Sequence, residues 1–157
     1  MNDNYKSLLP EGDHLKTFEE LIAICVSHFA PDNIKRMYLI NNLHKYIIVP
    51  LNELNFTCSL WINGSFLTDK VEPNDIDLII KIENANLCTL DQKAFLYTFI
   101  DTNNHIHFRN NFFLDVYFLS NDISGFNNHE YWYDWFTHDR NANGKGFIVL
   151  DIHGGVR

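Results

Sequence analysis

The sequence predicts an α+β fold in which a short mixed β-sheet is backed by helices, and three observations predict it. Apolar residues recur at helical spacing in the first part of the chain, between residues 17 and 50. From Phe56 onwards, short β-rich or alternating segments bounded by turn residues become frequent. The length of 157 residues fits one domain, and no repeat or linker divides it.

We expect a single domain, residues 1–157, made of three parts. These are a helical part, 1–50, a motif core, 56–119, and an aromatic segment with a final strand, 126–157. The first sixteen residues are expected to form an extended lead-in with a turn at residues 10–13.

Two helices are expected before residue 50. Thr17 and Glu20 have the spacing of a capping box, which opens the first helix, and Ala30-Pro31 ends it. Asp32 is expected to cap the second helix, whose apolar and aromatic residues continue at helical spacing up to Pro50.

The rest of the chain is predicted to alternate between strands and one helix. Residues 91–101 have helical spacing, and a polar turn at residues 141–144 precedes the last strand. The expected strands are residues 56–62, 75–82, 106–109, 112–119 and 147–152.

Charge and cysteine usage narrow the class of protein. A net charge of −8 argues against a protein that coats nucleic acid through a broad basic surface. Three scattered cysteines with no Cys-x-x-Cys pair argue against a zinc cage and suit a reducing cytoplasm, so we expect a cytoplasmic protein. No secretory signal pattern and no apolar run near the roughly 20 residues of a bilayer span occurs, so no membrane association is expected.

The segment with most chemical information contains two closely spaced carboxylates. Asp75 and Asp77 open a predicted strand, and because side chains alternate along a strand, both lie on one face while Ile76 lies on the other. Two carboxylates so close together repel each other unless they share a cation. The alternative is an ordinary strand-entry turn.

A third carboxylate, Asp115, lies within an otherwise apolar predicted strand, where an unpaired charge would be costly unless it faces water at a sheet edge. If that strand lies beside the strand of Asp75 and Asp77, the three carboxylates converge. Three oxygen donors plus phosphate oxygens suit magnesium, and two ions about 3.5–4 Å apart can clamp both oxygens of a phosphoryl displacement.

Gly64 and Ser65 end the strand before these carboxylates. Glycine lets the backbone approach a phosphate closely, and a serine hydroxyl with neighbouring N–H groups can hold it. An ordinary turn is the alternative for this pair. Arg109 and Lys145 are further phosphate-clamp candidates, although a solvated charge is the favoured interpretation of each.

The ordered pattern Gly64-Ser65, nine residues, Asp75-Ile76-Asp77, then Asp115 in a later apolar strand resembles the DNA polymerase beta-like nucleotidyltransferase superfamily, especially its minimal, single-domain type. The resemblance implies a nucleotidyltransferase-like sheet. It also implies metal binding by Asp75 and Asp77, a second metal site completed by Asp115, and triphosphate binding by Gly64 and Ser65. Small members often continue with an arginine-rich turn, whereas here only Lys70 is basic, so Lys70 is the nucleotide-binding candidate there.

The function implied by this resemblance is magnesium-dependent transfer of a nucleoside monophosphate, from a nucleoside triphosphate such as ATP to a hydroxyl of a protein or RNA acceptor. Small members often belong to toxin–antitoxin or phage-defence modules, so a cognate toxin or antitoxin is an expected partner. The alternative function is a catalytically inactive binding module for a protein partner or a nucleotide. A metal-dependent phosphohydrolase would also need clustered carboxylates, but its signature is absent from the sequence.

Three other groups of residues have simpler interpretations. His105 and His107 are expected to alternate on one face of the short strand 106–109, as half-exposed histidines rather than ligands. Residues 139–144 imitate the start of a calcium-binding loop, but Leu150 stands where a glutamate is needed, so we interpret them as a polar turn. The aromatic residues between 131 and 136 are interpreted as core.

Overall fold

A computed structural model describes residues 5–121, 129–138 and 143–154. Five strands form one mixed sheet in the order β1-β5-β2-β3-β4. The strands are β1 (Gly12–Leu15), β2 (Thr57–Asn63), β3 (Ile76–Ile82), β4 (Leu114–Ser120) and β5 (Gly146–His153). The α+β class with a mixed sheet backed by helices is confirmed.

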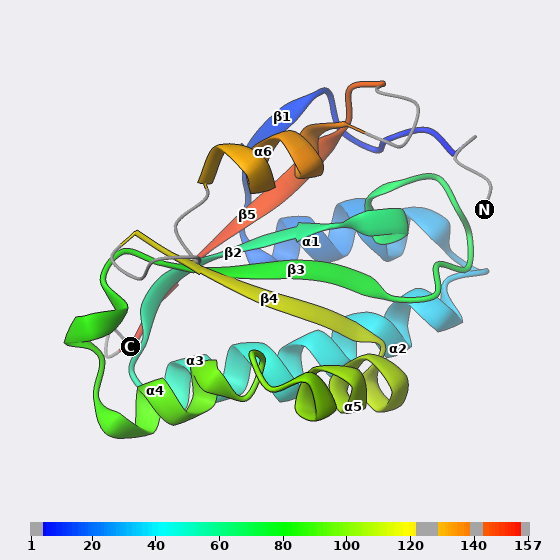
Figure 1. Ribbon diagram of the computed structural model, residues 1–157. Helices are drawn as coiled ribbons and strands as arrows, with labels where there is room; N and C mark the ends of the chain where they lie inside the picture. The colour runs from blue at the N-terminus through cyan, green and yellow to red at the C-terminus, as the bar shows by residue number, and fades with distance from the viewer. Residues whose placement is uncertain (1–4, 122–128, 139–142, 155–157) are drawn as a thin grey trace.

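Most helices pack on one face of the sheet and α6 packs on the other, as Figure 1 shows. The α-helices are α1 (Phe18–Cys25), α2 (Ile34–Leu43), α3 (Val49–Glu53), α4 (Leu90–Tyr97), α5 (Thr102–Phe112) and α6 (His129–Thr137). A π-helical segment, η2 (His44–Ile48), joins α2 to α3. The 3-10 turns are η1 (Ser27–Phe29), η3 (Gly64–Leu67) and η4 (Ala85–Leu87).

Alternation along the strands divides the apolar residues between two cores. Ile76, Leu78 and Ile80 of β3 belong to the larger core, which contains buried residues of α1 to α4. Ile79 belongs to a smaller core with Phe136 of α6. Since Asp77 is two residues before Ile79, it lies on the α6 face of the sheet, as the alternation predicts.

The capping box at the start of α1 is confirmed. The Glu20 N–H donates to Thr17 Oγ1 at 3.1 Å, and the Thr17 N–H donates to Glu20 Oε1 at 3.0 Å. The same motif, missed by sequence reasoning, opens α4 at Thr89 and Gln92. Capping boxes satisfy N–H groups that the first helical turn leaves without intrahelical partners.

Several local predictions are wrong. Residues 106–109 belong to α5, because Asp101 caps that helix by accepting from the N–H groups of Asn103 and Asn104. Residues 12 and 13 start β1, which pairs in parallel with β5, rather than completing a turn.

Near the second helix, Asn33 rather than Asp32 occupies the N-cap position, and it makes no side-chain cap bond. Pro50 does not end the helical part, because it lies in the first turn of α3, which continues directly from the π-helical segment η2. Most of the calcium-loop-like segment, residues 139–142, lies outside the described residues.

Candidate functional site

The three candidate carboxylates come together where β3 and β4 begin. These strands are parallel neighbours, and Asp77 pairs in register with Asp115. Asp75 comes directly before β3, whose first N–H, that of Ile76, donates to Phe113 O at 3.0 Å. The predicted adjacency of the two carboxylate strands is therefore confirmed.

The Gly64-Ser65 turn lies against the same carboxylates. β2 runs antiparallel to β3, and its last residue, Asn63, pairs with Asp77. Gly64 then adopts a φ of +83°, and a Cβ there would lie 2.6 Å from Asp77 Oδ2. Only glycine therefore fits this turn while Asp77 keeps its position.

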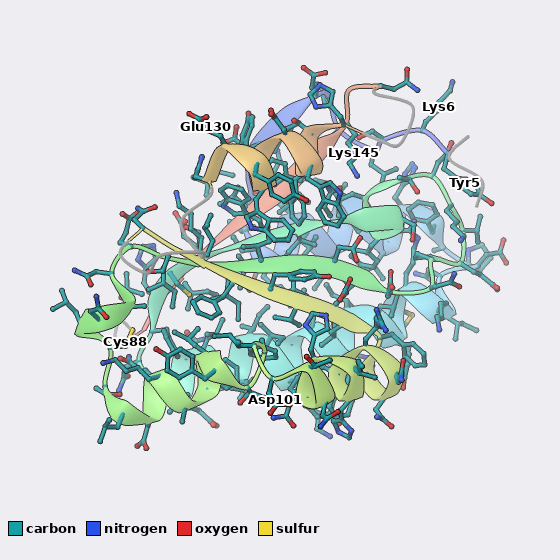
Figure 2. The ribbon with its side chains drawn as sticks, in the orientation of Figure 1. Tyr5, Lys6, Cys88, Asp101, Glu130 and Lys145 are labelled. Atoms are coloured by element: carbon teal, nitrogen blue, oxygen red, sulfur yellow. The ribbon has the colours of Figure 1, made fainter. Side chains whose placement is uncertain are left out.

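A cavity of about 560 Å³ contains the whole predicted constellation. We call it the acidic cavity. Trp135 and Phe136 of α6 contribute to its wall, and Lys145, labelled near α6 in Figure 2, also lines it. The predicted site residues in its lining are Gly64, Ser65, Lys70, Asp75, Asp77 and Asp115.

Burial and mutual repulsion make the carboxylates reluctant to ionise together. Burial, followed by the charges of Asp75 and Asp115, raises the pKa of Asp77 to about 7, although Lys145 acts in the opposite direction. Burial and then Asp115 also raise the pKa of Asp75, against the opposing charges of Arg109, Lys70 and Lys35. The nearby lysines thus do not neutralise the cluster.

Asp115 has partners that sequence reasoning missed. The His105 ring is within hydrogen-bonding distance, with Nε2 2.7 Å from Asp115 Oδ1. The Tyr117 hydroxyl donates to Asp115 Oδ2 at 3.4 Å, and burial followed by the Asp115 charge raises the pKa of Tyr117 to about 12. His105 reaches Asp115 because α5 is a helix packed beside β4, so an interpretation of residues 106–109 as a strand could not have found this contact.

A buried arginine fixes the loop after the Gly64-Ser65 turn. Arg36 of α2 is completely buried, and its Nη1 donates to Phe66 O at 2.6 Å and to Cys25 O at 2.8 Å. Its Nη2 donates to Thr68 O at 2.7 Å and to Lys70 O at 2.5 Å.

The Arg36 guanidinium also lies 3.7 Å from the centre of the Phe29 ring. Burial lowers the pKa of Arg36 to about 10, which leaves it charged at neutral pH. The residues after Gly64-Ser65 include no arginine-rich turn. Instead, Arg36 of α2 donates hydrogen bonds to the backbone oxygens of those residues.

The donor set suits magnesium, but the side chains do not preform a metal site. Within the described parts of the chain, no group of three His, Cys, Asp or Glu side chains is arranged to hold a metal ion. Asp115 is instead paired with His105, and its charge helps to raise the pKa of Asp77. Three hard oxygen donors nevertheless fit the ion chemically, and binding would require Asp115 to leave His105 and the three carboxylates to rotate toward a common point.

The side-chain oxygen of Asn63, which lines the acidic cavity, is buried without a hydrogen-bond donor among the described residues. Asn63 is buried and donates from Nδ2 to Phe136 O at 2.6 Å. Its Oδ1 is also buried and has no hydrogen-bond partner among the described residues. Buried polar atoms are normally paired, so this oxygen suits a donor brought by a ligand or by water.

Of the remaining candidates, only Lys145 is among the described residues that line the acidic cavity. Arg109 is exposed on α5 and is not part of the cavity lining, whereas Lys145 is half-buried and lines it. His107 is exposed on α5, where its Nδ1 lies 3.0 Å from Asn111 Nδ2. No helix among the described residues is long and apolar enough to cross a membrane.

The fold and the cavity define an α+β domain with a carboxylate cluster beside a Gly-Ser turn. The chain belongs to DUF6932, a family of unknown function, which it matches over residues 1–151. Searches of curated proteins and of solved structures found no match to it.

Proposed function

We propose that this chain is a magnesium-dependent nucleotidyltransferase, which moves a nucleoside monophosphate from a nucleoside triphosphate to a hydroxyl of a protein or RNA acceptor. One observation carries the proposal: Asp75, Asp77 and Asp115 enter one cavity beside the Gly64-Ser65 turn. This is the grouping that the resemblance implies. The volume of about 560 Å³ lies within the range of small-molecule sites.

In this reaction the residues of the cavity would bind the phosphates, hold the metal ion and accept a proton. The Gly64 backbone and the Ser65 hydroxyl would hold the outer phosphates, with Lys70 and Lys145 supplying positive charge at the cavity wall. The three carboxylates would hold magnesium, which supplies charge stabilisation for the α-phosphate and the leaving pyrophosphate. The acceptor oxygen forms a bond to the α-phosphorus as the bond to pyrophosphate breaks, and Asp115 accepts the acceptor's proton.

The resemblance extends the proposal to a partner. Small proteins of the resembled type often act within toxin–antitoxin or phage-defence modules, so we propose a cognate toxin or antitoxin as the partner. The net charge of −8 favours a protein acceptor over RNA, because RNA would be repelled by an acidic surface.

A labelling experiment tests the transfer reaction. The protein is incubated with magnesium, each α-³²P-labelled nucleoside triphosphate and extract of its host cell. Label should enter protein or RNA with the wild type but not with Asp75→Ala/Asp77→Ala. Asp32→Ala, which removes an exposed carboxylate outside the cavity, is the matched control and should keep full activity. Transfer that persists without both site carboxylates, or no transfer with any nucleotide, would refute the proposal.

The second candidate function is a non-catalytic binding module. The pairing of Asp115 Oδ1 with His105 Nε2 at 2.7 Å and the raised pKa of Asp77 favour it, because a paired Asp115 and a protonated Asp77 need no metal ion. Isothermal titration separates the two functions. A catalytic site should bind a non-hydrolysable triphosphate analogue only with magnesium, whereas a binding module should bind its nucleotide equally well in EDTA.

A further inference from the structure

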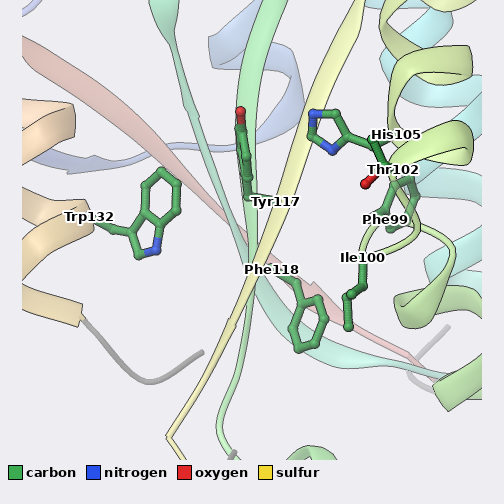
Figure 3. A pocket seen from close by; sticks show the side chains of 7 residues that line it. All are labelled: Phe99, Ile100, Thr102, His105, Tyr117, Phe118 and Trp132. Carbon is green, nitrogen blue, oxygen red and sulfur yellow. The ribbon is translucent and has the colours of Figure 1, made fainter. Parts of the chain in front are cut away.

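A second cavity, of about 340 Å³, is lined by residues of β4, α5, α6 and the turn before α5. Figure 3 shows its side chains, with Trp132 from α6 on one side, Tyr117 and Phe118 from β4 in the middle, and His105 from α5 on the other. We call it the ring pocket. Its lining residues are Phe99, Ile100, Thr102, His105, Tyr117, Phe118 and Trp132.

The ring pocket and the acidic cavity share a wall. His105 and Tyr117 line the ring pocket, and both contact the carboxylate of Asp115, which lines the acidic cavity. In the sheet order β2-β3-β4, the Gly64-Ser65 turn follows β2, while the ring pocket lies at the edge strand β4. A group in the ring pocket would therefore enter from the side opposite the proposed phosphate site.

The walls of the ring pocket suit a flat, uncharged ring. The Tyr117 ring centre lies 4.9 Å from that of His105 and 5.0 Å from that of Trp132, at interplanar angles of 54° and 39°. Phe99 and Phe118, each only 5% exposed, close the apolar end, and Ile100, 41% exposed, stands at the rim. Because these three rings already contact one another, a bound ring would pack against their exposed edges at the mouth of the pocket rather than between them.

Charge distinguishes a protein side chain from an RNA base as the occupant. None of the described residues in the lining is lysine or arginine, so none of them would neutralise the phosphates that flank an RNA base. Single-stranded RNA sites combine stacking rings with a basic groove, and this pocket has only the rings. The net charge of −8 acts in the same direction.

We propose that the ring pocket binds an uncharged aromatic side chain of a protein acceptor, and so holds that acceptor beside Asp115. Binding of the ring needs neither metal nor nucleotide. That the bound protein is the acceptor rests on the proposed function. This pocket would explain how a protein with a net charge of −8 selects a protein acceptor.

The test measures ring binding without magnesium or nucleotide. Methyl-labelled protein is titrated with N-acetyl-tyrosinamide and N-acetyl-phenylalaninamide, and in parallel with adenosine and uridine, which are uncharged rings of the competing class. The amides should produce saturable shifts of the Ile100 and Thr102 methyl signals, and both nucleosides should bind more weakly.

Two substitutions locate the binding. Ile100→Trp fills the rim and should weaken amide binding about tenfold or more, followed through the Thr102 methyl signal. Ile106→Trp is the matched control, because Ile106 is similarly exposed at 38% but does not line the pocket, and it should leave binding unchanged. Trp132→Leu removes one wall and should also weaken binding.

Three results would overturn the proposal: tighter or equal binding of the nucleosides, no saturable shift with either amide, or unchanged amide binding by Ile100→Trp. Failure of the nucleotide-labelling experiment while the amides still bind would refute the transferase function and leave the ring pocket intact.

Discussion

Removing the buried guanidinium of Arg36 should destabilise the protein more than almost any other single substitution. Its two terminal nitrogens donate to four backbone oxygens at 2.5–2.8 Å, three of them in the loop after the Gly64-Ser65 turn. Hydrogen bonds from a charged donor contribute about 1.5–3 kcal/mol each, and the desolvation of a buried charge offsets several kcal/mol of that. We therefore expect Arg36→Met to lower the free energy of unfolding by about 3–5 kcal/mol.

Urea unfolding followed by circular dichroism measures this change, with a lower midpoint at an unchanged slope as the expected signature. Arg36→Lys keeps a charge but not the planar pair of donors, so it should fall between the wild type and Arg36→Met. Arg109→Met removes an exposed arginine and should change stability by less than about 0.5 kcal/mol. If Arg36→Met costs less than about 1 kcal/mol, the four hydrogen bonds do not hold the loop as argued.

Four further predictions concern the carboxylates, the Gly64 turn and one helix cap. The pKa of Asp77 is about 7 in the folded protein, which is above its value in the unfolded chain. The free energy of unfolding of the wild type should therefore fall as pH rises from 5 to 8. Asp77→Asn should flatten that slope and raise the free energy of unfolding at pH 8 by on the order of 2–4 kcal/mol. Magnesium at pH 8 should raise the melting temperature of the wild type but not of Asp77→Asn, and calorimetry measures both effects. Gly64→Ala, with its Cβ 2.6 Å from Asp77 Oδ2, should abolish nucleotide labelling while the protein stays folded by circular dichroism. Thr17→Ala should cost about 1 kcal/mol in urea unfolding, and an unchanged midpoint would contradict the capping box.

Local patterns predicted those parts of the fold that depend on neighbouring residues. The capping box at Thr17 and the alternation along β3 were recognisable because each is complete within a few residues. β1 was missed because its four residues, Gly12–Leu15, have no apolar pattern and become a strand only by pairing with β5, more than 130 residues later. Residues 106–109 imitated a strand because His105, Ile106 and His107 alternate, while the cap that makes them helical lies at Asp101.

The candidate site likewise contains residues that the sequence predicted and one that it could not predict. Asp75, Asp77, Asp115 and the Gly64-Ser65 turn were predicted together, because their order in the sequence resembles that of a known superfamily, and all of them line one cavity. Arg36 could not be found in this way. It lies 30 residues before Phe66, and an arginine on an otherwise ordinary helix gives no signal that it is buried.

The electrostatics of the cavity bear on function independently of any resemblance. β3 and β4 would be more stable with a neutral residue at Asp77, because burial and two neighbouring carboxylates oppose its ionisation. The lysines at the cavity, Lys70 and Lys145, do not offset this cost, since the pKa of Asp77 remains raised with both in place. Protonation of Asp77 relieves this cost without any ion, whereas a divalent cation would relieve it with all three carboxylates ionised. A fall of the Asp77 pKa on addition of magnesium therefore distinguishes a metal-binding site from a binding module.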